Sequence, residues 1–312
     1  MITRKGIIGL SIEDDVTILV HIQRKAGNKF IINEVKQFIT PPGAIFDGDI
    51  VHKTELIKDL TQIVMLSKLT GVPTVIAISP RQAIIRSVNL PQMPKNDILK
   101  SLEWEASRYI TLSNTSFTMD YNKLSEKEID GTTYLELLMI AAKNGVLQKF
   151  SSLVKKSGLK IKSIDLEVMA YLYLRKFAYL NNVWSELEKA WTSVAIGNSC
   201  TSVSFFQRDV LQFVHTIPIK KNNIINNEEE IIRELQRSLN YYHNQIKKEK
   251  TQAIYIWGKD AEKILSRLQG KLEFPIYNLK LSLLNNVFET SESLLKDEIA
   301  YALGLSLREV VS

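Results

Sequence analysis

The sequence contains a single cysteine, Cys200, in 312 residues. A lone cysteine excludes a disulfide framework and a cysteine-based zinc site, and it fits a reducing compartment. No apolar run approaches the ~18–20 residues that span a bilayer, and the N-terminus lacks the pattern of a signal peptide. The sequence therefore predicts a cytoplasmic protein that reaches a membrane only through a partner or through charge.

Common signatures of catalysis are also missing. No Gly-x-Ser-x-Gly elbow, no P-loop and no Gly-x-Gly-x-x-Gly after a strand is present, so three common enzyme classes lack their motifs. The four histidines stand far apart, and none has a second ligand type at metal-binding spacing: His21, His52, His215 and His243. The sequence thus predicts no catalytic residue and no metal site.

The net charge is +6 and the isoelectric point is about 9.1. Such a balance brings nucleic acid and anionic lipid into consideration. The basic residues are scattered, however, and none of their denser groups is interleaved with aromatic residues at base-stacking spacing. A solvated surface is favoured over a nucleic-acid groove.

Two stretches about half a chain apart share one pattern, an apolar run, a short polar loop and a second strand. One lies at residues 5–23 and the other at residues 191–219. In each, a threonine (Thr17 or Thr201) opens a strand predicted to alternate toward solvent. Two such copies predict two related lobes that face each other across a cleft. Any two β-hairpins can look this similar, so the echo alone leaves that alternative open.

Strands and helices alternate along the whole chain, as in a mixed α/β protein. Helices are predicted at 53–68, 96–110, 144–157, 167–180, 228–248, 261–268 and 294–307. A polar turn is predicted at 125–131, and Gly158 stands where a helix C-cap glycine belongs. The order strand, helix, strand, strand, helix predicts a compact inserted α+β unit at 83–158. No linker separates the lobes, which predicts one rigid body with a hinge.

Three short polar loops each follow a predicted strand, at residues 11–15, 197–201 and 258–260. Loops of this kind expose backbone N–H groups that can face phosphate oxygens. Three of them in this order, in two echoing lobes, point to the actin-like fold. In that fold two loops grip phosphates and a third holds the adenosine.

The chain resembles the PilM family of actin-like type IV pilus assembly proteins, relatives of the cell-division protein FtsA, from about residue 6 onward. The matching pieces are Asn89–Pro94, Leu102–Ala106 with Tyr109-Ile110, Asp120-Tyr121, Leu138–Lys143, Ser157–Leu159, Ile164-Asp165, Arg237–Leu239 and Ala302–Glu309. The resemblance implies an α/β (α+β) actin-like ATPase fold with an inserted subdomain. It implies a first domain at 1–82 plus about 160–190, the insertion at 83–159, a second half at 191–293, and a C-terminal helix at 294–312 that packs back on a sheet.

The chain departs from the family at its phosphate loops. Where the family has Asp-Ile-Gly, this chain has Ser11-Ile12-Glu13 in the first loop and Ala195-Ile196-Gly197 in the second. Both carboxylates that would organise Mg²⁺ are therefore replaced, and Mg²⁺ requires oxygen ligands in near-octahedral geometry. Glu13 also adds a negative charge where a polyphosphate would lie. The glycine pair expected after the third strand of the second lobe is Lys220-Lys221.

The resemblance nevertheless gives a set of candidate nucleotide-binding residues. Asp14 could replace a missing carboxylate, and Lys259 could neutralise a phosphate. The full set is Ser11, Glu13, Asp14, Gly197, Asn198, Ser199, Thr201, Arg237, Gly258 and Lys259. ATP hydrolysis is not expected. No cofactor is assigned, and ATP with Mg²⁺, which the fold would hold, stays an open alternative.

By resemblance, the predicted function is a scaffold on the cytoplasmic face of the inner membrane. It would hold the N-terminal tail of a PilN-like membrane protein in a groove between the first domain and the insertion, and so couple the pilus motor to the assembly platform. One alternative is an active actin-like ATPase or nucleotide-gated adaptor that uses Asp14 and Asn198. A second is the cytoplasmic module of a type II secretion platform, which normally continues into a transmembrane helix.

Overall fold

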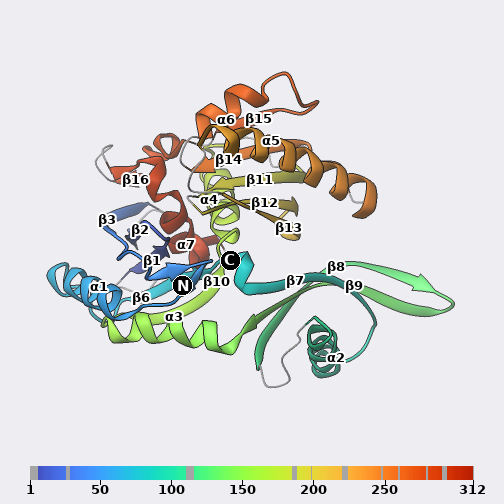
Figure 1. Cartoon of the computed structure of the whole chain (residues 1–312), viewed down its shortest axis with the longest axis horizontal. Coiled ribbons are helices and arrows are strands. Elements are labelled where there is room, and N and C mark those ends of the chain that lie inside the picture. The colour runs from blue at the N-terminus through green and yellow to red at the C-terminus, as the bar shows by residue number, and fades with distance from the viewer. Residues whose placement is uncertain are drawn as a thin grey trace.

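The computed structural model describes residues 6–25, 29–109, 116–184, 188–197, 199–219, 224–246, 249–258, 261–278, 280–289 and 294–311. The candidate residues Asn198 and Lys259 lie outside these ranges, as do Lys220, Lys221 and Asp260. The chain forms two lobes and a smaller unit beside them (Figure 1).

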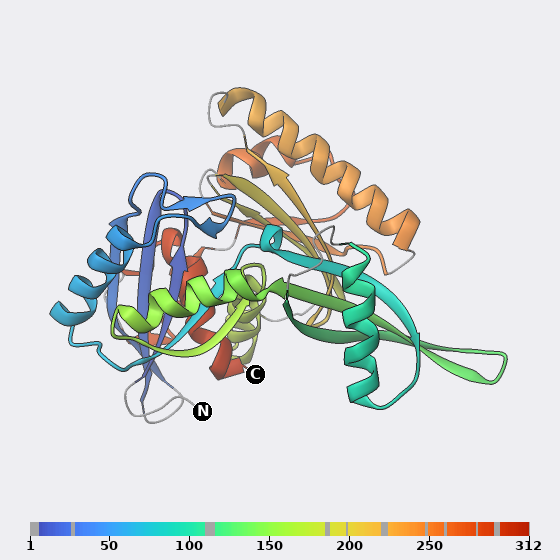
Figure 2. The same ribbon diagram turned by 60° about the horizontal axis from the view of Figure 1, so that its bottom comes forward.

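The first lobe is built on a six-stranded mixed sheet. Its strand order is β10 (Lys160–Leu166), β6 (Pro73–Ile78), β1 (Ile7–Ile12), β2 (Val16–Arg24), β3 (Phe30–Ile39) and β16 (Phe288–Glu289). Helices α1 (Thr54–Leu66) and α3 (Asn144–Lys156) cover one face, and α4 (Met169–Leu180) and α7 (Ala300–Val311) cover the other (Figure 2). Because both faces are covered, β6 is an apolar strand that is buried almost throughout.

The second lobe has a five-stranded sheet of order β13 (Val210–Pro218), β12 (Cys200–Gln207), β11 (Ala190–Ile196), β14 (Ala253–Gly258) and β15 (Ile276–Asn278). Alternate side chains enter two different cores, as the period of a strand requires. Val194 and Phe205 pack with Leu235 of α5 (Ile224–Tyr241) and with α6 (Ala261–Leu268). Trp191 and Phe206 belong instead to the core shared with the first lobe.

The predicted echo is confirmed residue by residue. In the first hairpin Ile12 pairs with Thr17, and in the second Ile196 pairs with Thr201. The predicted alternation toward solvent is wrong, because β2 and β12 are both buried along nearly their whole length. Each strand lies inside its sheet with packed elements on both faces, so both sets of side chains are enclosed.

The smaller unit is a three-stranded sheet, β7 (Ala83–Pro91), β9 (Thr132–Lys143) and β8 (Phe117–Ile129), with helix α2 (Lys95–Ser107) on one face. Its β8–β9 hairpin projects away from both lobes (Figure 2). The predicted seven-residue turn is wrong: the strands continue to Ile129 and Thr132 around Asp130-Gly131. Both turn residues have positive φ, 49° and 72°, as a tight two-residue hairpin turn requires.

A second tight hairpin, β4 (Ile45–Phe46) and β5 (Asp49–Ile50), turns at Asp47-Gly48, also with positive φ at both residues. It is joined to the segment that precedes β7, since Gln82 Nε2 donates to the Asp47 carbonyl at 2.7 Å. The predicted C-cap role of Gly158 is confirmed by its φ of +84° at the end of α3.

Two predicted helices differ most from the observed bounds. The helix predicted at 228–248 begins earlier as α5, and a π-helical segment, Tyr242–Ile246, follows it. The helix predicted at 294–307 begins only at Ala300, after a 3₁₀ turn at Asp297–Ile299. Asp297 Oδ1 accepts a hydrogen bond from the backbone N–H of Leu281 at 2.8 Å, and this bond holds the turn in place. The division of the chain into domains with the predicted bounds stays a proposal.

Candidate functional site: an acidic cavity between the lobes

A cavity of about 490 Å³ lies between the two lobes, at the ends of the echoing hairpins. The β1–β2 loop, the residue after β10, the ends of β11 and β14, and the start of α7 all contribute to its wall. The acidic members of the wall are Glu13, Asp15, Glu167, Asp297 and Glu298. Among the described lining residues there is no lysine or arginine, so the described part of the wall is acidic.

In each of the two loops expected to bind phosphates, a backbone N–H donates a hydrogen bond within the loop. The backbone N–H of Glu13 donates to the Val16 carbonyl at 3.0 Å, and the N–H of Gly197 donates to the Cys200 carbonyl at 3.0 Å. Glu13 and Gly197 occupy the same position of the two echoing loops. Both of these N–H groups are therefore already satisfied within the turn and are not available to a phosphate oxygen.

The candidate residues separate into three groups. Glu13, Gly197 and Gly258 line the main cavity, and Asp14 and Ser199 line a smaller pocket of about 40 Å³ beside it. The remaining described candidates lie outside both. Ser11 and Thr201 are fully buried in their strands. Arg237 lies on α5, 68% exposed and 2.5 Å from Glu234. The nucleotide-binding role of the whole set stays a prediction.

Gly258 is glycine for a structural reason. It ends β14 opposite Ile196, and a Cβ added to it would lie 2.2 Å from the Ile196 carbonyl oxygen. Its φ of +93° is also a conformation that other residues rarely adopt. Strand pairing thus accounts for this glycine without any bound ligand.

Sequence reasoning missed Glu167, which lies between β10 and α4 and contributes to both the cavity and the smaller pocket. Burial raises the pKa of Glu167 to about 7, partly offset by the nearby Arg81. Burial also raises the pKa of Glu13 to about 8, and repulsion from Glu167, Asp15 and Asp14 adds to the effect. The sequence carried one signal for Glu167: a carboxylate directly after a buried strand, at the edge where cleft residues gather.

Arg81 was also missed. It lines the smaller pocket from the 3₁₀ turn Pro80–Gln82 and forms an ion pair with Asp47 of the β4–β5 hairpin. Cys200 lines the same pocket, and burial raises the pKa of its thiol to about 11. A thiol in that state is not a reactive nucleophile at neutral pH.

The N-termini of two helices face this cavity, and acidic side chains already stand at both. Glu167 precedes α4 by two residues, while Asp297 and Glu298 precede α7. A helix N-terminus attracts anions, and carboxylates near it stabilise the helix. The protein's own carboxylates therefore stand where a ligand's phosphates would gain from the helix dipoles.

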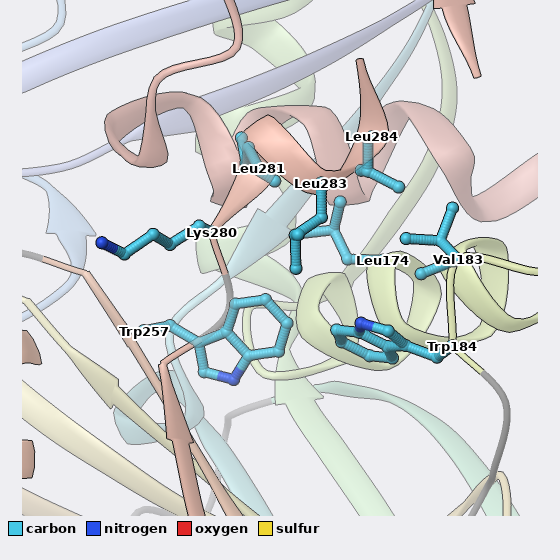
Figure 3. A pocket seen from close by; sticks show the side chains of 9 residues that line it. Leu174, Val183, Trp184, Trp257, Lys280, Leu281, Leu283 and Leu284 are labelled. Atoms are coloured by element: carbon cyan, nitrogen blue, oxygen red, sulfur yellow. The ribbon is translucent and has the colours of Figure 1, made fainter. Parts of the chain in front are cut away.

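Aromatic rings form part of the cavity wall. Tyr171 lies against Trp257, with ring centroids 4.8 Å apart, and Tyr301 lies 6.5 Å from Tyr171. Trp257 itself lines a different, apolar pocket, together with Trp184 and Leu284 (Figure 3). That pocket holds only about 10 Å³, too little for more than one water, and reads as a packing gap between the lobes.

A sequence model of the type IV pilus assembly protein PilM matches residues 9–216, more than half of the chain. The chain belongs to the PilM family. This confirms the family that the sequence motifs indicated. Comparison with curated protein sequences finds no significant match.

Solved structures show the fold of this PilM family member. A chain of a PilM–PilN type IV pilus biogenesis complex superposes with a TM-score of 0.80 at 20% identity, over 99% of both chains. A Bacteroides thetaiotaomicron protein with an actin-like ATPase fold gives 0.49 at 10% identity, over 97% of this chain and 96% of that one. The cytoplasmic domain of EpsL, from the type II secretion system of Vibrio cholerae, gives 0.47 at 9% identity, over 90% and 98%. The TM-score of 0.80 confirms the predicted fold.

Two kinds of feature are absent from the described residues. They contain no group of three or more histidine, cysteine, aspartate and glutamate side chains that could hold a metal ion. None of their helices is long and apolar enough to cross a membrane.

Replacing Glu13 with glutamine should stabilise the protein at pH 8 by about 2 kcal/mol, and by much less at pH 5. The folded pKa of about 8 lies above the ordinary 4.5, so the folded state holds this proton more tightly than the unfolded state. Wild-type stability therefore falls as the pH rises from about 4.5 to about 8. The figure is discounted because the side chain is partly exposed. Urea unfolding of both proteins at pH 5 and pH 8 measures it, and an equal difference at the two pH values would contradict this interpretation.

Proposed function

We propose that this protein is a scaffold of a type IV pilus machine that binds the N-terminal tail of a PilN-like inner-membrane protein. The observation that carries the proposal is the shared fold over 99% of both chains with a PilM–PilN complex, in a chain of the PilM family. The tail would hold the scaffold at the cytoplasmic face of the inner membrane. The net charge of +6 supports this placement, because anionic leaflets attract basic proteins in a salt-sensitive way.

We further propose that the interlobe cavity does not turn over ATP. Its described wall carries five acidic side chains and no basic one. A nucleoside triphosphate would bring several negative charges next to these side chains, and like charges ~4 Å apart repel by about 1 kcal/mol even in water. It would also oppose the ionisation of Glu13 and Glu167, whose pKa values are already raised. The engaged N–H groups of Glu13 and Gly197 remove two donors on which phosphate binding would depend.

The junction between the first lobe and the inserted unit is the proposed place for the tail. The β4–β5 hairpin is fixed there by the ion pairs Arg81–Asp47 and Lys149–Asp49, the second at 2.6 Å. Phe46 stands on this hairpin with 74% of its surface exposed. An extended peptide can be held by backbone pairing to a sheet edge, with apolar contacts for alternate side chains. An exposed phenylalanine on a fixed hairpin offers one such contact.

Calorimetric titration with a PilN-like N-terminal peptide and, separately, with Mg-ATP tests the proposal. We expect the peptide to bind and Mg-ATP to give no heat. Phe46→Ala should weaken peptide binding about tenfold, as the loss of a buried aromatic contact does. Leu66→Ala is the matched control, because Leu66 is similarly exposed (75%) but lies at the end of α1.

The outcomes separate the alternatives. Peptide binding that depends on Phe46 and not on Leu66 supports the proposed junction. Tight binding and turnover of Mg-ATP would replace the scaffold with an active ATPase. Absence of peptide binding to the wild-type protein would overturn the PilN-like partner.

A further inference from the structure

The interlobe cavity has the features of a site for a cation. Two of its tyrosines, Tyr171 and Tyr301, are only 7% exposed and line the cavity wall. Neither hydroxyl has a hydrogen-bond partner among the described residues, although buried tyrosine hydroxyls ordinarily find one. Unpartnered hydroxyls at an otherwise acidic cavity indicate a ligand that donates hydrogen bonds and is attracted to carboxylates.

The acidic side chains of the wall belong to two separate places. Glu13 and Glu167 lie near the ends of β1 and β10, and each raises the pKa of Tyr171 and of Tyr301. Asp297 and Glu298 line the cavity from a different segment, the 3₁₀ turn that precedes α7. The apolar lining residues are Val16, Ile18, Ala195, Ile196 and Ala300. The ligand should therefore carry positive charge at more than one point along an aliphatic chain.

We propose that this cavity binds a small aliphatic polyamine in place of a nucleotide. Its ammonium groups would donate to the carboxylates and to the two tyrosine hydroxyls, while its methylene groups would lie along the apolar and aromatic wall. Ammonium groups are also attracted to the faces of tyrosine rings. A volume of about 490 Å³ falls within the range of ordinary small-molecule sites.

A metal ion or an anion fits the same wall less well. Among the described residues no cluster of three or more ligating side chains could hold a metal. Arg81, the one described cation near Glu167, lines only the neighbouring pocket and is paired with Asp47. An organic cation needs neither a tight ligand shell nor a basic wall.

The ionisation of the cavity carboxyls predicts whether polyamine affinity rises or falls with pH. The groups that face Glu13 and Glu167 are Asp14, Asp15, Arg81, Tyr171, Cys200 and Tyr301. Of the two carboxyls, Glu167 loses its proton near pH 7 and Glu13 near pH 8. A polyamine favours the ionised carboxylates, so its affinity should rise as the pH increases from 6 to 8.5. An anionic nucleotide would show the opposite slope, since it favours the protonated forms.

The experiment is calorimetric titration of the full chain with spermidine at pH 6 and pH 8.5. We expect saturable binding that tightens at the higher pH. Glu167→Gln should weaken binding at pH 8.5 on the order of tenfold, because it removes one charge from a partly closed cavity. Glu128→Gln is the matched control: Glu128 is an exposed residue of β8, far along the projecting hairpin, and should change the affinity less than about twofold.

Three results would overturn the proposal: no saturable heat with spermidine, equal weakening by both substitutions, or affinity that falls as the pH rises. Equal weakening would mean that spermidine is attracted only to the acidic surface at large. This site is independent of the proposed peptide junction. Failure here would leave the tail-binding function standing, and failure of the peptide titration would leave this proposal standing.

Discussion

Replacing Gly304 with alanine should lower the free energy of unfolding by about 3 kcal/mol. Gly304 lies in the middle of α7, where that helix crosses α4. A Cβ at this position would stand 2.2 Å from the carbonyl oxygen of Ala170 and 3.0 Å from its Cα. Because these are backbone atoms of a packed helix, the clash is relieved only by moving the two helices apart.

The matched control is Gly145→Ala, on α3. A Cβ there meets no atom within 4 Å, and the added methyl favours the helix, so stability should stay level or rise by up to about 1 kcal/mol. Urea unfolding of the three proteins measures both effects. If the Gly304 variant were as stable as the control, the close approach of α4 and α7 would not be a requirement of the fold.

The same substitution should also disturb the cavity. Tyr171 lies on α4 next to Ala170, and Tyr301 lies on α7 less than one turn from Gly304. Both tyrosines line the cavity, and their ring centroids are 6.5 Å apart. Packing between the helices therefore fixes the distance between the groups to which the proposed cation would bind.

The sequence predicted the lobes because their signal is local. Ser11 and Ala195 end apolar runs, polar loops follow, and threonines open the partner strands, so both hairpin registers could be read directly. The inserted unit was predictable for the same reason. Its turn was misplaced because the strand end at Ser125–Ile129 is polar, and a solvent-facing strand end of a projecting hairpin is as polar as a loop.

The cavity was less predictable because its wall comes from distant segments. Glu167 and Tyr301 are 134 positions apart, yet both line it, and no local pattern links them. Arg237 was predicted to bind nucleotide because it lies in a family motif, but its side chain is exposed on α5 and pairs with Glu234. The loops at Glu13 and Gly197 were read as phosphate-binding because loop composition does not show that their N–H groups are used within the turn.

The contact between the two lobes includes a buried cation that no sequence motif predicted. Arg175 of α4 is 1% exposed and forms an ion pair with Glu188. Its guanidinium lies 4.4 Å from the ring centroid of Trp191 in β11 and 5.2 Å from that of Tyr255 in β14. The Tyr255 hydroxyl donates to Glu188 Oε1 at 2.7 Å, which completes the group. One side chain of the first lobe is thus enclosed by the second.

Replacing Arg175 with methionine should lower the free energy of unfolding by about 3–4 kcal/mol, because Glu188 loses its partner in a largely buried place. Lys176→Met is the matched control: its ion pair with Asp209, at 3.0 Å, is partly exposed, and its loss should cost less than about 1 kcal/mol. Adding Glu188→Gln to the Arg175 variant should restore part of the loss, since no unpaired charge then remains. Urea unfolding of the four proteins gives the coupling energy between the two side chains. A coupling energy near zero would mean that the Arg175–Glu188 ion pair does not help to hold the lobes together. Aromatic packing around Arg175 would then account for the contact between them.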